Sequence, residues 1–78
     1  MEALIDYIAR SLVDDPTQIE INQYKRGSTV TFELTVAKED MGRVIGKGGR
    51  VATAMRALLR VAAAREGARA SLDIVDPK

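Results

Sequence analysis

Residues 44–50 read Val-Ile-Gly-Lys-Gly-Gly-Arg and lie past the midpoint of a 78-residue chain. Glycine fills three of the four positions from 46 to 49, whereas one glycine is enough to end a helix. Because glycine lacks a Cβ atom, its backbone can adopt conformations closed to other residues and can lie directly against a ligand. This stretch therefore predicts a loop that a binding partner approaches closely.

The charges around the loop favour an anion as its ligand. Lys47 places a positive charge inside the loop, and Arg50 begins the segment that follows. If that segment is a helix, its first free N–H groups and the positive end of its dipole also attract anions. A P-loop is excluded because no Lys-Ser or Lys-Thr follows the glycines. From these residues alone, a phosphate contact and a flexible corner between two helices both remain open.

Hydrophobic spacing divides the chain into six segments. Their order is helix, strand, strand, helix, helix, strand, over residues 3–13, 19–24, 30–36, about 39–45, about 50–65 and 70–75. The clearest alternation runs from Val30 to Val36, where every second side chain is apolar. We expect residues 25–28 to form a hairpin connection. Glu39 and Asp40 are expected in the first turn of the fourth segment, where acids suit the helix dipole.

Three strands with one apolar face each and three amphipathic helices most simply form two layers. The sequence therefore predicts an α+β fold in which three helices cover one face of a three-stranded sheet. No internal repeat, low-complexity tract or linker interrupts residues 1–78, so we expect a single domain. The other face of the sheet would meet water or a partner.

Composition excludes several classes of function. The chain has no cysteine and no histidine, which removes disulfides, thiolate metal sites and the commonest general base. We therefore expect no catalytic residue, no metal and no cofactor. The N-terminal residues, from Met1 to Asp6, carry acids within their apolar stretch, unlike a signal peptide or a membrane-spanning helix. A cytoplasmic location is the resulting expectation.

Charge is unevenly distributed, although the net charge is only +1. Residues 1–40 hold eight acids and four bases, whereas residues 41–78 hold eight bases and three acids. No acid occurs from Met41 to Arg65. The basic half fits a polyanion site, which Arg56 and Arg60 would extend, but a solvated basic helix face explains it equally well.

Residues 44–50, together with Gly42 and Arg43 before them, resemble the Val-Ile-Gly-x-x-Gly signature of K-homology (KH) domains. The predicted order of helices and strands resembles the type II form of that fold over nearly the whole chain. The length and the single domain are similar to those of the small bacterial RNA-binding family known as KhpA. The resemblance implies a GxxG loop that clamps the backbone of about four nucleotides of single-stranded RNA. It also implies a role as a post-transcriptional regulator or RNA chaperone.

The resemblance assigns RNA contacts to eight residues of this sequence: Gly46, Lys47, Gly48 and Gly49 as the clamp, Arg43 and Arg50 as flanking phosphate contacts, and Val44 and Ile45 as groove lining. Ordinary core packing is the alternative for Val44, Ile45 and the nearby Val51, because apolar residues at helical spacing are usually buried. Base stacking is expected to contribute little, since the chain has only two tyrosines and one phenylalanine.

A second hypothesis is that the domain acts mainly as a dimerisation or scaffold module. Residues 50–65 offer more apolar positions than one packing stripe needs, and Leu58 and Leu59 point about 100° apart on a helix. The candidate interface comprises Met55, Leu58, Leu59 and Ala62. The KhpA resemblance implies a homodimer, or pairing with a larger KhpB-like KH protein. An enzyme is disfavoured because the acids lie on segments expected to face solvent or cap helices.

Overall fold

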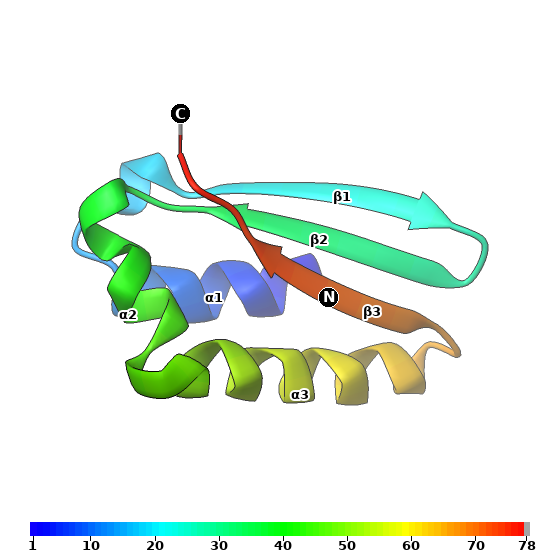
Figure 1. Ribbon diagram of the computed structural model, residues 1–78. Coiled ribbons are helices and arrows are strands. Elements are labelled where there is room, and N and C mark those ends of the chain that lie inside the picture. The colour runs from blue at the N-terminus through cyan, green and yellow to red at the C-terminus, as the bar shows by residue number, and fades with distance from the viewer. Residues whose placement is uncertain (78) are drawn as a thin grey trace.

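Residues 1–77, which the computed structural model describes, form a three-stranded mixed sheet and three helices (Figure 1). β1 (Glu20–Arg26) pairs antiparallel with β2 (Thr29–Thr35), and β2 pairs parallel with β3 (Arg69–Ile74), in the order β1-β2-β3. The turn between β1 and β2 is shorter than the predicted connection, because both strands continue into polar residues that carry no hydrophobic pattern. The mixed sheet leaves β1 and β3 as edge strands.

The helices cover one face of this sheet, as the sequence predicts. α1 (Glu2–Leu12) and α3 (Arg50–Arg65) lie beneath the sheet in Figure 1, and the short α2 (Met41–Ile45) lies at one end. The order α1-β1-β2-α2-α3-β3 confirms the predicted α+β fold. None of the helices within residues 1–77 is long and apolar enough to cross a membrane. The chain also contains short 3-10 turns, which the sequence does not predict because single turns carry no hydrophobic period: Pro16–Gln18, Lys38–Asp40 and Lys47–Gly49.

The core lies between the sheet and the helices. Val30, Phe32 and Leu34 of the central strand β2 are buried on its helix side, as their alternation predicts. Other elements contribute further buried apolar side chains: Ile5, Ala9, Val36, Val44, Ala52, Met55, Leu59, Ala63 and Leu72. β1 has a weaker pattern because it is an edge strand whose single large aliphatic residue, Ile21, is only half-buried.

A buried carboxylate joins the start of α2 to the segment after α1. Asp40 is 1% exposed and accepts hydrogen bonds from the backbone N–H groups of Asp14 and Asp15, both at 3.1 Å. The guanidinium of Arg43 lies 2.7 Å from the same carboxylate. The pKa of Asp40 is lowered, chiefly by the hydrogen bond from Asp14, against the opposing effect of burial. Asp40, which the sequence predicts in a first helical turn, therefore also links the segment after α1 to the start of α2 through hydrogen bonds.

Replacing Asp40 by Asn should lower the melting temperature at pH 7 by roughly 5–15 °C, because an amide accepts fewer of these hydrogen bonds and offers Arg43 no charge. The difference from wild type should shrink as the pH falls. The stability that Asp40 contributes through its lowered pKa is fully present above the pKa that this carboxyl has in the unfolded chain. It is lost as the pH falls through the pKa of Asp40 in the folded protein.

Thermal denaturation followed by circular dichroism at pH 7 and pH 3 measures both effects. Glu39→Gln is the matched control, because Glu39 is an exposed neighbour in the same turn. Equal losses for the two variants at pH 7 would contradict the role given to Asp40.

Candidate nucleic-acid interface

The glycine loop connects the end of α2 at Ile45 to the start of α3 at Arg50. Gly46, Gly48 and Gly49 all have positive φ angles, of 78°, 64° and 77°. Residues with a side chain disfavour this region, because their Cβ atom comes too close to the backbone. The backbone N–H of Gly49 donates to the carbonyl of Gly46 at 3.0 Å and closes a tight turn. The path of the backbone therefore favours glycine at all three positions.

The three glycines differ in their surroundings. A Cβ atom on Gly46 would collide with the side chain of Val51 and lie 2.8 Å from its backbone nitrogen, so only glycine lets α2 end this close to α3. A Cβ atom on Gly48 or Gly49 would meet nothing within 4 Å. Gly46 thus closes the corner between the helices, while the other two glycines border open space beside the exposed Lys47.

Alanine substitutions should separate these two roles. Gly48→Ala should destabilise the domain by about 1–2 kcal/mol, the cost of a left-handed backbone conformation for a residue with a side chain. Gly46→Ala should destabilise it clearly more, because Val51 must also move. Urea denaturation of both variants measures the difference, and a Gly48→Ala variant at least as unstable as Gly46→Ala would contradict this division.

Two of the residues that the resemblance assigns to RNA are held within the fold. Val44 is fully buried in the core, in agreement with the packing alternative. The Arg43 guanidinium lies 2.7 Å from Asp40 and 3.1 Å from Asp14, so it pairs with two carboxylates, while its side chain remains 48% exposed. Ile45 is 37% exposed and remains at the surface beside the loop.

A groove lies between α3 and the edge strand β3. Its lining residues come from both elements: Arg56, Arg60, Ala70, Ser71, Leu72 and Asp73. Nε of Arg56 donates to the backbone carbonyl of Leu72 at 3.0 Å, so this main-chain acceptor at the outer edge of β3 is already satisfied by Arg56. Arg56 is six residues beyond Arg50, or about 9 Å along the helix axis and roughly 120° around it, so the groove begins on the β3 side of α3 about 9 Å beyond the loop.

A second hollow continues this groove toward the start of β3. Arg60 and Ala70 line both depressions, and the second one adds Ala64, Ala68 and Arg69. The sequence indicates that Arg56 and Arg60 could extend a basic track but does not reveal the groove itself. Its shape depends on the parallel pairing of β3 with β2, which leaves the other edge of β3 beside α3.

The residues of the candidate dimer interface separate into two groups. Met55 and Leu59 are buried in the core and are not available to a partner. Leu58 is 51% exposed, and Ala62 is half-buried. Val61, which sequence reasoning missed, is 58% exposed and lies three residues beyond Leu58 on the same outer surface of α3. An inward and an outward leucine are what the adjacent positions of Leu58 and Leu59 predict.

The chemistry available at this site is that of binding. The loop offers main chain without side-chain obstruction, Lys47 and Arg50 offer positive charge, and β3 offers an edge with main-chain hydrogen-bonding groups. Within residues 1–77, no group of three acids, cysteines or histidines is placed to hold a metal ion. The bare loop, the two positive charges and the strand edge together suit a ligand that carries negative charge and many groups able to form hydrogen bonds.

The fold and the loop together define a class of protein. The order α-β-β-α-α-β, with a parallel final strand and a GxxG loop between the last two helices, is that of a type II KH domain. The family model described as "KhpA/KhpB, KH domain" matches residues 2–74, and the chain belongs to this family.

Curated relatives match the chain over almost its full length. RNA-binding protein KhpA of Halalkalibacterium halodurans is 41% identical over 76 residues, which are 97% of this chain and 100% of that protein. The proteins of the same name from Caldanaerobacter subterraneus subsp. tengcongensis and Chlamydia trachomatis serovar D are 44% and 38% identical, over 96% and 100% of this chain and 100% of each relative. No solved structure matches the chain significantly.

Proposed function

We propose that this chain binds single-stranded RNA through residues 46–49 and the groove between α3 and β3, as a post-transcriptional regulator or RNA chaperone. The observation that carries the proposal is the open space at Gly48 and Gly49, between the cationic side chains of Lys47 and Arg50. The names of the relatives, RNA-binding proteins of the same length, support the same ligand.

The loop binds the sugar-phosphate chain. Because Gly48 and Gly49 carry no Cβ, the ligand backbone can lie directly against the protein main chain, and Lys47 and Arg50 neutralise its phosphates. α3 begins at Arg50, and its N-cap residue Gly49 has no side chain to bond the first N–H groups of the helix. The Arg50 N–H donates to the carbonyl of Lys47, so the N–H groups that follow it and the positive end of the helix dipole are what α3 offers to the same phosphates.

The bases lie in the groove beyond the loop. Ile45 offers an apolar contact at its mouth, and the outer edge of β3 offers main-chain hydrogen bonds to unpaired base edges. A duplex has no unpaired edges to offer, so single strands bind better. The lining residues of the groove include no aromatic side chain on which bases could stack, so one domain binds with modest affinity.

The double substitution Lys47→Asp and Gly48→Asp should abolish binding of a short single-stranded RNA, because two carboxylates would face the phosphates. The domain should still fold, because both side chains enter open space, with a loss of stability of about 1–2 kcal/mol from the positive φ of Gly48. Fluorescence anisotropy measures binding, and circular dichroism checks the fold. The matched control is Arg10→Asp with Ser11→Asp, which makes the same change in charge at exposed positions of α1.

The control variant should retain most of the affinity, since long-range attraction between exposed charges is screened at physiological salt. Wild-type affinity in a folded Lys47→Asp, Gly48→Asp variant would contradict the loop assignment. A preference for duplex over single strands would contradict the role of the groove.

The outer face of α3 supports a second role in self-association. Leu58 and Val61 are exposed, and the exposed Ala54 and Ala57 lie one turn before them, which makes an apolar stripe on the side away from the core. Two copies that pack these stripes together bury the side chains from water. A KhpB-like KH protein is the alternative occupant, since the family description names both kinds of protein.

Replacing Leu58 by Glu should shift the protein from dimer to monomer at tens of micromolar without loss of the fold, because the side chain is outside the core. Leu59→Glu is the contrasting variant and should unfold the domain, because it buries a charge. Sedimentation velocity reports the mass of each variant. Wild-type protein that sediments as a monomer at this concentration would contradict the homodimer.

A further inference from the structure

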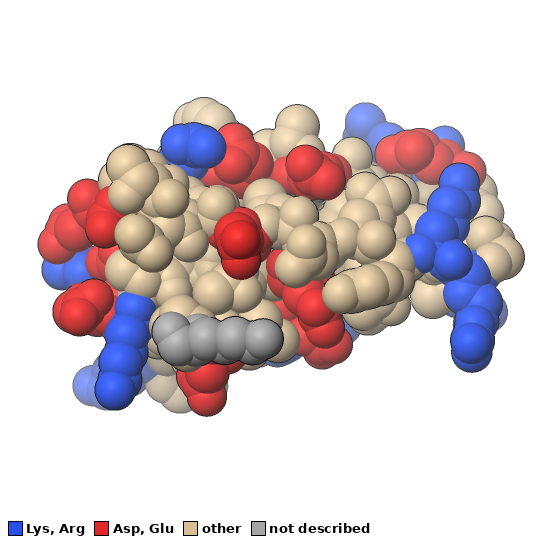
Figure 2. Space-filling model, turned by 90° about the horizontal axis from the view of Figure 1, so that it is seen from above, with Lys and Arg blue, Asp and Glu red and all other residues tan. Residues whose placement is uncertain are grey.

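The face of the sheet that points away from the helices carries a graded pattern of side chains. Its residues form successive rows across the three strands. From the hairpin end these rows are Arg26, Thr29 and Arg69, then Tyr24, Thr31 and Ser71, then Asn22, Glu33 and Asp73. The face is therefore basic at the hairpin, neutral with one aromatic ring in the next row, and acidic beyond it. Figure 2 shows this face, with basic side chains across its right end and acids toward its middle and left.

The first row places two guanidinium groups near each other without a counter-charge. Arg26 and Arg69 lie on either side of Thr29, and neighbouring strands are about 4.8 Å apart, so their Cα atoms are separated by roughly 10 Å. Among the described residues, no carboxylate forms an ion pair with either arginine or with the nearby Lys25. Like charges at this distance repel, and an anion between them would remove that repulsion.

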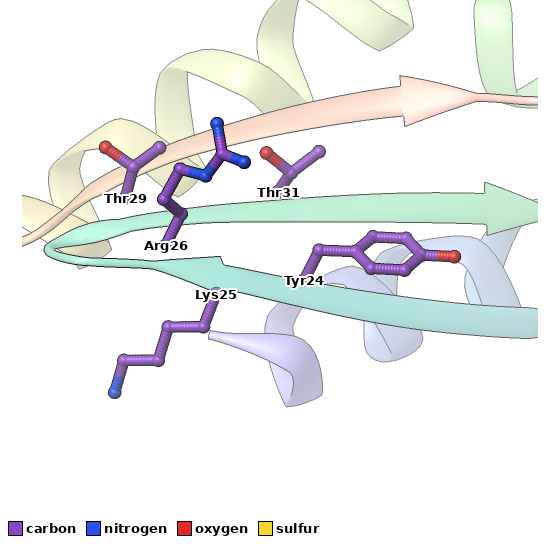
Figure 3. A pocket seen from close by; sticks show the side chains of 5 residues that line it. All are labelled: Tyr24, Lys25, Arg26, Thr29 and Thr31. Atoms are coloured by element: carbon purple, nitrogen blue, oxygen red, sulfur yellow. The ribbon is translucent and has the colours of Figure 1, made fainter.

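The second row offers a surface for a flat apolar ring. Tyr24 is 56% exposed, and the hydroxyls of Thr31 and Ser71 in the same row lie 3.1 Å apart. The Tyr24 phenol is uncharged at neutral pH, and the charge of Glu33, together with its hydrogen bonding, raises its pKa further. Figure 3 shows the five residues that line a depression at this end of the sheet, Tyr24, Lys25, Arg26, Thr29 and Thr31, with the side chain of Lys25 directed to the opposite side of β1 from that of Arg26.

This basic end of the sheet is connected to the groove beside α3. Arg69 belongs to the first row of the open face and also lines the hollow that Arg60 shares with the groove. Because β3 is an edge strand, a side chain at its start can contact a ligand on the open face of the sheet and also one in the hollow beside α3. A chain of cationic residues therefore leads from the groove around β3 to the hairpin: Arg56, Arg60, Arg69 and Arg26.

We propose that single-stranded RNA which leaves the groove crosses the edge strand at Arg69 and continues on the open face, with a phosphate between Arg26 and Arg69 and a base on Tyr24. This inference rests on the proposed function, because the groove must first be occupied. The patch adds one or two nucleotides to those held by the loop and the groove. Glu33 and Asp73 end the track, since their charges repel the next phosphate.

The chemistry of the patch fits RNA better than an acidic protein. Carboxylates of a protein would satisfy the arginines but would leave the exposed tyrosine ring and the paired hydroxyls without a specific contact. A nucleotide uses all three, because every base has a face that stacks on an aromatic ring and its sugar and phosphate accept hydrogen bonds. Stacking is also tolerant of sequence, so this extension lengthens the site without restricting its targets.

The test compares oligouridines of 5 and 12 nucleotides, since the loop and groove hold about four. Arg26→Gln should weaken binding of the 12-mer about five-fold or more and leave the 5-mer within two-fold of wild type, because Arg26 does not line the groove. Tyr24→Leu should also weaken only the 12-mer, by about five-fold or more, whereas Tyr24→Phe should bind like wild type. Arg10→Gln removes one positive charge from α1 and is the control for general attraction.

Salt dependence gives an independent readout. In wild type, the slope of log affinity against log salt should be steeper for the 12-mer than for the 5-mer by about 0.7, from the one further phosphate contact. The Arg26→Gln variant should show a smaller difference. Circular dichroism confirms that each variant is folded.

Several outcomes would overturn the inference. One is wild-type affinity of both sheet variants for the 12-mer; another is an equal loss for both oligonucleotides. A third is a shift of the sheet variant from dimer to monomer with 12-mer binding unchanged, which would make the patch a protein interface. Failure of the proposed function is distinguishable, because then the Lys47→Asp, Gly48→Asp variant would bind the 5-mer like wild type whatever the sheet variants do.

Discussion

The contact between Gly46 and Val51 is the constraint on which the site depends. Because no Cβ stands at position 46, the end of α2 lies against the first turn of α3, and the chain must reverse within the residues between them. The reversal requires positive φ angles at Gly48 and Gly49, which leaves their backbone bare toward solvent. A corner made for packing thereby also exposes main chain and uncapped N–H donors beside two cations.

The strand β3 supplies the second surface of the proposed binding site. It is an edge strand with one side paired to β2, and its other side faces the groove beside α3. Its side chains alternate between the core and the open face of the sheet, so Leu72 is buried while Arg69 and Ser71 are exposed. One strand therefore borders the core, the groove and the open face. The groove beside α3 and the open face of the sheet are therefore continuous around the edge that β3 forms.

The sequence predicts the features that local chemistry determines. The alternation of β2, the helical spacing of α3 and the need for glycine in the loop all appear in the structure as expected, since each depends on neighbouring residues. Features that depend on distant pairing were not predictable. The pairing of Arg43 with Asp14 and Asp40 is visible only once the fold brings these residues together. The row of Arg26 and Arg69 exists only once the strand order and register are known.

The most direct test of the central claim is an NMR titration of the isotope-labelled protein with a single-stranded pentanucleotide. The account predicts that the largest amide shifts fall on Lys47, Gly48, Gly49 and Arg50, followed by residues along the outer edge of β3, while α1 is unaffected. Shifts centred on α1 or on the outer face of α3, with the loop unmoved, would contradict the account.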